Sequence, residues 1–102
     1  MRTPKEIAAE VKALKKLKPL IPAQSQFRDD NHGGVDAQME VLQSDMTEDD
    51  IYTRADDGVT AADNLWSDYV RDLAMDALKW KTGDSFEAPS VSWEPLTASR
   101  PL

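Results

Sequence analysis

The one histidine of the chain lies among residue types that bind metal ions, in the run DDNHGGVD (residues 29–36). His32 and Asp36 are four residues apart, so a helix would place the imidazole and the carboxylate on one face. A general base can use such a pair, whereas a metal centre also needs two or three further ligands in a defined geometry. We interpret the pair as a helix-start and surface arrangement, and a metal-binding module at residues 29–40 remains an alternative.

The same stretch imitates part of an EF-hand calcium loop. Asp29, Asn31, Gly34 and Glu40 fall at positions one, three, six and twelve of that pattern. However, position five is a glycine, position eight is an aspartate instead of an apolar residue, and two prolines interrupt the entering helix. A helix that begins near Asn31 would also carry Glu40 away from the other ligands. A calcium loop is therefore not the lead interpretation.

No other group of residues predicts catalysis. The chain has no cysteine, no glycine-rich phosphate loop, no nucleophile elbow and no paired-histidine zinc motif. Its serines have no second histidine to serve as a general base. We expect a non-enzymatic protein without a cofactor, a catalytic residue or a metal ligand.

Charge is unevenly distributed along the 102 residues, whose net charge is −7. Residues 1–20 hold six Lys or Arg and two Asp or Glu, residues 21–57 hold two and ten, and residues 58–102 hold four and seven. This distribution favours docking of the basic first segment on the acidic middle, or binding of a basic partner protein. Direct binding of nucleic acid is not expected, because phosphate contacts need clustered cations.

The longest amphipathic stretch predicts a helix over residues 60–81 around which the others pack. Thr60 is the expected N-cap, and Gly83 supplies the residue that can turn left-handed at the end. Apolar residues recur at spacings of three and four, which forms one continuous stripe; they are Ala62, Leu65, Trp66, Tyr69, Leu73, Ala77 and Trp80.

The opposite face of this helix carries a ladder of aspartates, and the segment before it is also acidic. We predict that these carboxylates contact a basic partner. The candidate partner-binding residues are Asp45, Glu48, Asp49, Asp50, Asp56, Asp57, Asp68, Asp72 and Asp76.

A first helix is predicted at the start of the chain. Thr3 and Glu6 form a capping box, and Pro4 fits the first helical position. The helix should end near Lys18, because a proline follows. We expect the connector after it to be anchored on the core by Leu20, Ile21 and Phe27.

Two more helices are predicted in the acidic middle. One begins at residue 30 or 31 and runs to about residue 42. The other is capped by Thr47, with Asp50 at the capping-box position, and ends near Ala55.

These elements predict an all-α fold of three or four helices packed around the long one. The helical domain spans residues 1–83, and an extended, proline-containing tail spans residues 84–102 and packs partly on the domain through anchors such as Phe86 and Trp93.

No apolar run approaches the ~20 residues of a membrane span, and the first residues lack the apolar core of a signal peptide. We therefore expect a cytoplasmic protein that does not bind membranes.

Two segments, DDNHGGVDAQ (residues 29–38) and APSVSW (residues 88–93), make the chain resemble small uncharacterised acidic proteins encoded by phages, prophages and plasmids of enteric bacteria. The similarity would extend from TPKEIA near the start to the final Trp-Glu-Pro. These segments have no assigned chemistry, so no functional residue is implied. The resemblance implies a context, because accessory proteins of mobile elements often act by binding a host protein.

The lead hypothesis is thus a non-catalytic interaction protein of a mobile element that inhibits or modulates a host DNA-associated or defence protein. Its acidic residues would occupy a basic nucleic-acid groove, as a nucleic-acid mimic, and binding would weaken steeply with salt. An alternative is a structural homo-oligomer whose interface is formed by Trp66, Tyr69, Trp80 or Trp93. The metal-binding module at residues 29–40 is the other alternative.

Overall fold

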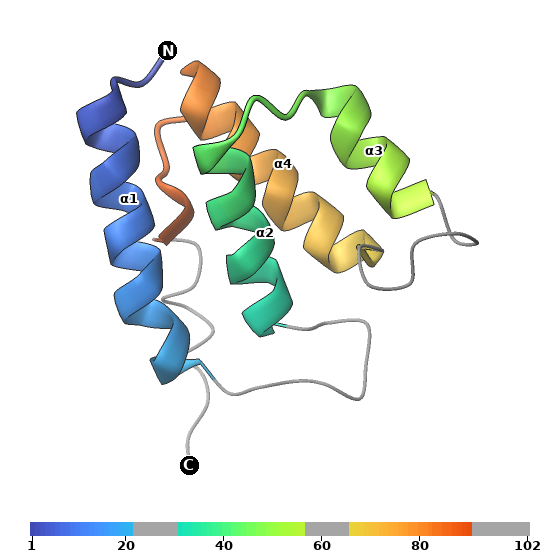
Figure 1. The fold of residues 1–102 in the computed structure, drawn as a ribbon, viewed down its shortest axis with the longest axis horizontal. Helices are drawn as coiled ribbons and strands as arrows, with labels where there is room; N and C mark the ends of the chain where they lie inside the picture. The colour runs from blue at the N-terminus through green and yellow to red at the C-terminus, as the bar shows by residue number, and fades with distance from the viewer. Residues whose placement is uncertain (22–30, 57–65, 91–102) are drawn as a thin grey trace.

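The described part of the chain consists of residues 1–21, 31–56 and 66–90 of a computed structural model and contains four helices and no strand. This confirms the all-α prediction. The elements are α1 (Pro4–Leu17), a 3-10 turn η1 (Lys18–Leu20), α2 (Asn31–Gln43), α3 (Glu48–Asp56) and α4 (Asp68–Thr82). Figure 1 shows α1 and α2 side by side and running in opposite directions, with α4 crossing behind α2 and α3 packed against α4. None of these helices is long and apolar enough to cross a membrane.

The first helix begins as its sequence predicts. The Glu6 amide donates to Thr3 Oγ1, and the Thr3 amide donates to Glu6 Oε1, both at 3.1 Å. Pro4 occupies the first turn, where the missing N–H breaks no hydrogen bond. The predicted end is also confirmed, since Lys18 is the C-cap and the chain then enters η1.

The second helix is the most enclosed, because α1 and α4 cover it on two sides. Its buried residues include small, apolar and polar side chains: Asn31, Gly34, Val35, Ala37, Gln38, Val41 and Leu42. At its C-terminal end the Lys81 ammonium donates to the carbonyls of Val41, at 3.2 Å, and Ser44. A cation suits this end of a helix, where carbonyls lack partners. The contact fixes α2 to the last turn of α4.

The fourth helix is shorter than predicted. A continuous helix from residue 60 to residue 81 is wrong, because Trp66 and Ser67 are not helical and α4 begins at Asp68. The Ser67 hydroxyl accepts a 3.2 Å hydrogen bond from the Val70 amide and so caps a new N-terminus. The predicted cap Thr60 lies outside the described residues. The predicted C-terminal end is confirmed, with Gly83 at φ 93° in the left-handed region.

The core gathers side chains from all four helices and from the residue after η1: Val11, Leu14, Ile21, Val35, Ala37, Val41, Leu42, Ile51, Val70, Ala74, Ala77 and Trp80. Ile21 is therefore the anchor that the sequence predicts. Leu20, predicted as a second anchor, is 71% exposed, because η1 buries none of its residues. The third predicted anchor, Phe27, lies outside the described residues.

The segment after α4 packs on the domain through residues other than those predicted. Phe86, an expected anchor, is fully exposed, whereas Pro89 is buried. The Ser90 amide and hydroxyl both donate to the carboxylate of Glu10, the hydroxyl at 2.9 Å. Glu10 is itself only 7% exposed, so this contact lies beneath the surface and joins α1 to the end of the described chain. The predicted anchor Trp93 lies outside the described residues.

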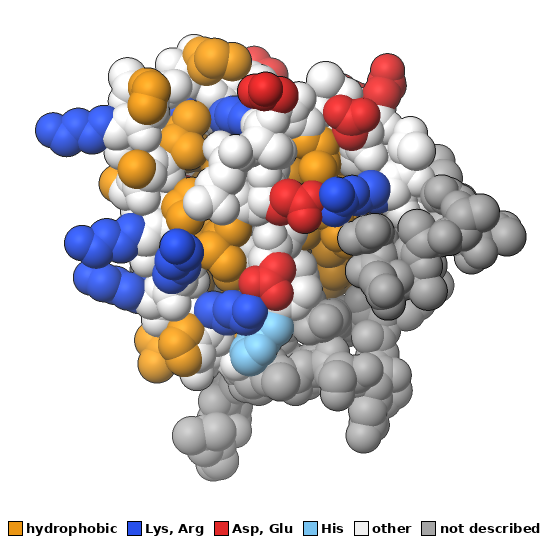
Figure 2. Space-filling view, viewed as in Figure 1, with side chains coloured by type: hydrophobic (Ala, Val, Ile, Leu, Met, Phe, Trp, Pro, Cys, Tyr) orange, Lys and Arg blue, Asp and Glu red, His pale blue; other side chains and the backbone are white. Residues whose placement is uncertain are grey.

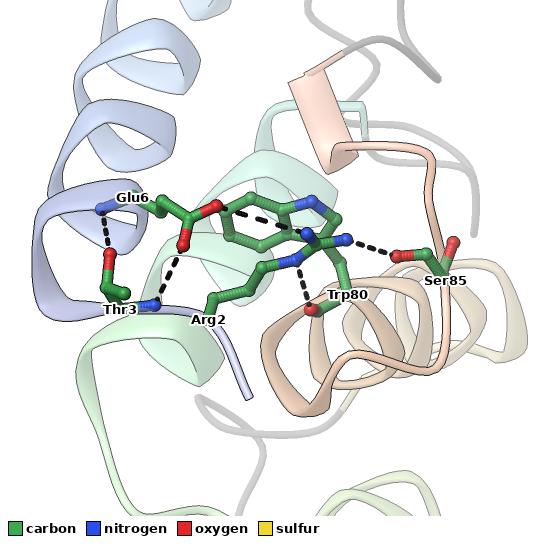
Figure 3. A network of polar contacts seen from close by, with 5 residues as sticks. All are labelled: Arg2, Thr3, Glu6, Trp80 and Ser85. Carbon is green, nitrogen blue, oxygen red and sulfur yellow. Dashed lines mark hydrogen bonds and ion pairs between the residues drawn. The ribbon is translucent and has the colours of Figure 1, made fainter.

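Arg2 makes a second connection between the two ends of the described chain, shown in Figure 3. Its Nε donates to the Trp80 carbonyl at 3.0 Å, and its Nη2 donates to the Ser85 carbonyl at 2.5 Å. The guanidinium carbon also lies 4.9 Å from the centroid of a Trp80 ring, within cation–π range. These contacts hold the start of α1 over the last turn of α4.

Candidate functional site

Four of the predicted partner-binding residues meet at the start of α3. Asp45 lies in the turn before the helix, and Glu48, Asp49 and Asp50 form its first turn. All four are exposed. Acidic residues accumulate there because the first turn of a helix leaves N–H groups without partners and carries a positive partial charge.

Asp50 differs from its neighbours because its carboxylate is engaged in the cap. Its Oδ2 accepts hydrogen bonds from the Thr47 amide at 2.9 Å and from the Thr47 hydroxyl at 3.0 Å, while the Asp50 amide donates back to Thr47 Oγ1 at 3.3 Å. The predicted capping box is thus confirmed. The Thr47 amide and then its hydroxyl stabilise the ionised carboxylate and lower the pKa of Asp50. We assign Asp50 to holding α3 in place.

The other acids at this end form no ion pair in the described part of the chain. Glu48 and Asp49 lie four and three residues before Tyr52, so they share a side of α3 with its ring. Tyr52 is 41% exposed. We call Asp45, Glu48, Asp49 and Tyr52 the α3 surface. It combines unpaired negative charge with an exposed aromatic side chain.

The predicted aspartate ladder forms one exposed stripe on α4, consisting of Asp68, Asp72 and Asp76. Arg71 partly neutralises it, with guanidinium nitrogens 3.5 Å from Asp68 Oδ1 and 3.2 Å from Asp72 Oδ1. The same guanidinium carbon lies 5.9 Å from the centroid of the Tyr52 ring. Arg71 therefore places the ladder beside the α3 surface but also reduces its charge.

Asp76, at the other end of the ladder, has a raised pKa. Partial burial disfavours its charged form, and the nearby carboxylates of Asp72 and Glu87 add to this effect, while Lys79 opposes it. Asp76, Lys79 and Glu87 line a small hollow of about 90 Å³ together with Ser85, Ala88 and Pro89. Asp76 lies in the C-terminal half of α4, and Glu87 follows the helix.

The two remaining predicted residues add little to the site. Asp56 is the last residue of α3, and Asp57 lies outside the described residues. The structure thus brings together Asp45, Glu48 and Asp49 in one place and Asp68 with Asp72 around Arg71.

The His32–Asp36 pair does not act as a unit. His32 Nε2 lies 2.7 Å from the Ile21 carbonyl oxygen, and Asp36 Oδ1 accepts a 2.7 Å ion pair from Lys18. Each side chain therefore ties α2 to the segment that ends α1. Within residues 1–21, 31–56 and 66–90, no three His, Cys, Asp or Glu side chains are grouped so that they could hold a metal ion. Asp29, the first ligand of the calcium pattern, lies outside this part.

Three of the four aromatic residues considered for an oligomer interface are described, and all three make contacts within the fold. Trp80 is 7% exposed, so its predicted role as an exposed interface residue is wrong. Trp66 lies under the Arg54 guanidinium, with 4.7 Å between the guanidinium carbon and the ring centroid. The Tyr69 hydroxyl donates to Asn31 Oδ1 at 2.7 Å. Trp93 lies outside the described residues.

Sequence reasoning missed Tyr52 as part of the acidic surface. The available signal was its spacing from Glu48 and Asp49 in a helix where the adjacent Ile51 already supplies the buried side chain. Tyrosine is enriched at protein interfaces because it contributes contact area at a low entropic cost.

Comparisons with protein-family models, with curated proteins and with solved structures gave no significant match to this chain.

Proposed function

We propose that this protein is a non-catalytic interaction protein that binds a basic surface of a partner protein through the α3 surface. The observation that carries the proposal is the set of three exposed carboxylates, Asp45, Glu48 and Asp49, that have no cation partner in the described part of the chain and adjoin the exposed ring of Tyr52. Exposed charges at the edge of an interface accelerate association with an oppositely charged partner, and they make the association depend on salt.

A basic protein that normally binds nucleic acid is the partner class that fits best. Such proteins present clustered Lys and Arg, and an acidic protein that occupies this cluster blocks the nucleic acid. In this proposal the protein is encoded by a mobile element and inhibits or modulates a host DNA-associated or defence protein. The ladder on α4 contributes less than its sequence indicates, because Arg71 pairs with Asp68 and Asp72.

The test is capture of partners from a bacterial lysate on the immobilised full chain, at about 0.05 M and about 0.5 M salt, between which screening of exposed charges increases strongly. Glu48→Gln/Asp49→Asn removes two charges from the α3 surface. Asp84→Asn/Glu87→Gln removes two exposed charges beyond α4 and is the matched control.

We expect one dominant basic protein, bound by the wild type and the control, lost with the α3 variant and lost at high salt. Duplex DNA added to the beads should release it. Salt-insensitive capture, equal capture by the α3 variant, or no specific capture would each contradict the proposal. If a basic protein is captured but duplex DNA does not release it, binding to a basic partner is supported and nucleic-acid mimicry is rejected.

A further inference from the structure

An open groove lies between α1 and α2, on the face of the molecule shown in Figure 2. Its volume is about 440 Å³, and it is lined by Pro4, Ile7, Ala8, Val11, Leu42 and Gln43. Binding sites in proteins commonly have volumes of this order and combine an apolar floor with a few polar groups at the edge. Val11 and Leu42 are buried and form the floor, while Ala8 and Gln43 are exposed at the edges.

Lysines border the α1 side of this groove. Lys5 precedes Ala8 by three residues, Lys12 follows Ala8 by four, and Lys15 follows Val11 by four, so all three lie on the helix side that lines the groove. They are exposed and form no ion pair in the described part of the chain. In Figure 2, blue Lys and Arg side chains lie beside orange apolar ones on the side of the molecule where Figure 1 places α1.

The acids on the α2 side of this face are already neutralised. Asp36 pairs with Lys18 at 2.7 Å, and Glu40 pairs with Arg54 at 2.5 Å. The groove therefore has an apolar floor, one cationic edge and no unpaired carboxylate among its lining residues. This charge distribution is opposite to that of the α3 surface.

We propose that the groove binds an acidic amphipathic helix of a partner protein. Apolar side chains at spacings of three and four would enter between α1 and α2, and carboxylates on one flank would meet Lys5, Lys12 and Lys15. A helix fits because two antiparallel helices leave a furrow into which the ridge of a third can pack. The described residues contain no strand whose edge could bind an extended peptide instead.

Charge and shape favour this occupant over three others. A bilayer requires protruding apolar side chains, whereas Val11 and Leu42 lie at the bottom of a furrow. Nucleic acid requires a polar, cationic floor, which this groove lacks. A second copy would have to insert its own acidic helix, but α3 already buries its apolar residue Ile51 in its own core.

The probe is a fluorescent synthetic peptide of about 16 residues, built from Leu, Ala and Glu, with Leu at i, i+4, i+7 and i+11. Binding to the full chain is followed by fluorescence anisotropy. Two peptides serve as controls, one with Lys in place of Glu and one of identical composition with scrambled order. The acidic amphipathic peptide should bind most tightly, and more salt should weaken its binding.

Variants of the protein test whether the peptide binds in this groove. Lys12→Gln/Lys15→Gln should weaken binding by about threefold to tenfold, since exposed ion pairs contribute little each, and Lys12→Arg/Lys15→Arg should restore it. Ala8→Glu, a good helix former at an exposed position, should weaken binding by tenfold or more, on the order of a like-charge contact. Lys79→Gln and Leu20→Glu change residues that do not line this groove, and each should change peptide binding by less than about twofold, as expected of surface positions away from the site.

Several outcomes would overturn the proposal. One is equal binding of the basic or scrambled peptide, and another is insensitivity to Ala8→Glu. Absence of peptide binding, together with binding of phosphatidylserine vesicles or duplex DNA that Lys12→Gln/Lys15→Gln removes, would assign the lysines to a membrane or a nucleic acid. A mass that rises with concentration in the wild type but not in Ala8→Glu would assign the groove to a second copy. Circular dichroism checks that each variant is folded.

Discussion

α1 and α3 are both charged helices that bury one side and begin with a capping box, but the other hydrogen bonds at α1 reach much further along the chain. Arg2, which precedes α1, donates to the Trp80 and Ser85 carbonyls, and Glu10 of α1 accepts from Ser90, so these contacts reach residues far away in the chain. The capping contacts of α3 join Thr47 and Asp50, three residues apart. Local contacts form as soon as the helix forms, whereas remote contacts must first offset the entropy of closing the chain. The remote contacts of α1 therefore depend on residues 80–90, whereas the cap of α3 depends only on its own first turn.

The largest predicted effect tests how far α1 depends on α4. Trp80→Ala should lower the free energy of unfolding by about 3–5 kcal/mol, because it leaves a cavity beneath Arg2 and removes the ring that the guanidinium covers. Urea denaturation followed by circular dichroism measures the change. A double-mutant cycle with Arg2→Ala should show coupling between the two sites. A loss below about 1 kcal/mol would mean that α1 is held mainly by other contacts.

The second effect concerns the buried carboxylate of α1. Glu10→Gln should cost about 1–3 kcal/mol, because the Ser90 amide and hydroxyl lose a charged acceptor in a buried place. Ser90→Ala, which removes only the hydroxyl donor, should cost less. The same denaturation experiment measures both, and equal costs would argue against the paired contact.

A third, smaller effect tests whether α3 is held by its local cap. Thr47→Ala should cost about 1 kcal/mol and should not alter the contacts of α1. It should also raise the pKa of Asp50 while leaving it below its ordinary value of 3.8, because the Thr47 amide still donates. The cap stabilises the fold above pH 3.8, and its contribution is lost as the pH falls through the lowered pKa. An NMR titration of the Asp50 carboxyl reports this, and a pKa unchanged by the mutation would contradict it.

The smallest effect has the opposite sign and concerns the end of the ladder that Arg71 does not reach. Because the pKa of Asp76 is raised in the folded protein, its contribution to stability is present below pH 3.8 and is lost as the pH rises through the folded pKa. Asp76→Asn should therefore stabilise the protein at neutral pH, by roughly 0.5 kcal/mol or less. The gain should vanish in acid. Asp72→Asn, which breaks the pair with Arg71, should bring no such gain in parallel thermal unfolding.

The features that were predicted correctly from the sequence are those that depend on contacts within one turn of a helix. The capping boxes of α1 and α3 each join residues three positions apart, so their partners are visible in the sequence. Gly83 ends α4 for a similarly local reason, since glycine tolerates a positive φ. The all-α fold follows from these local signals and the spacing of apolar residues.

The predictions from sequence failed where more than one residue could cap a helix, or where contacting residues lie far apart in the chain. Thr60 was expected to cap the helix because the apolar spacing starts just after it, but the cap of α4 is Ser67, a residue type that also favours this position. Nothing near Glu10 or Leu20 in the sequence indicates that one is buried against Ser90 and the other exposed. The candidate site shows the same limit, because the exposed acids were identified but the place of Tyr52 beside Arg71 requires the packing of two helices.

The contact between Arg2 and residues 80–85 has a consequence for synthesis. α1 emerges from the ribosome before residues 80–85 have been translated, so the nascent helix at first lacks the partners of Arg2. During that interval its lysines and apolar stripe are available to chaperones and to the ribosome surface. The contacts of Arg2 with Trp80 and Ser85 can form only when the last turn of α4 has left the exit tunnel. The order in which the chain is made thus gives α1 two successive environments, although its sequence encodes one helix.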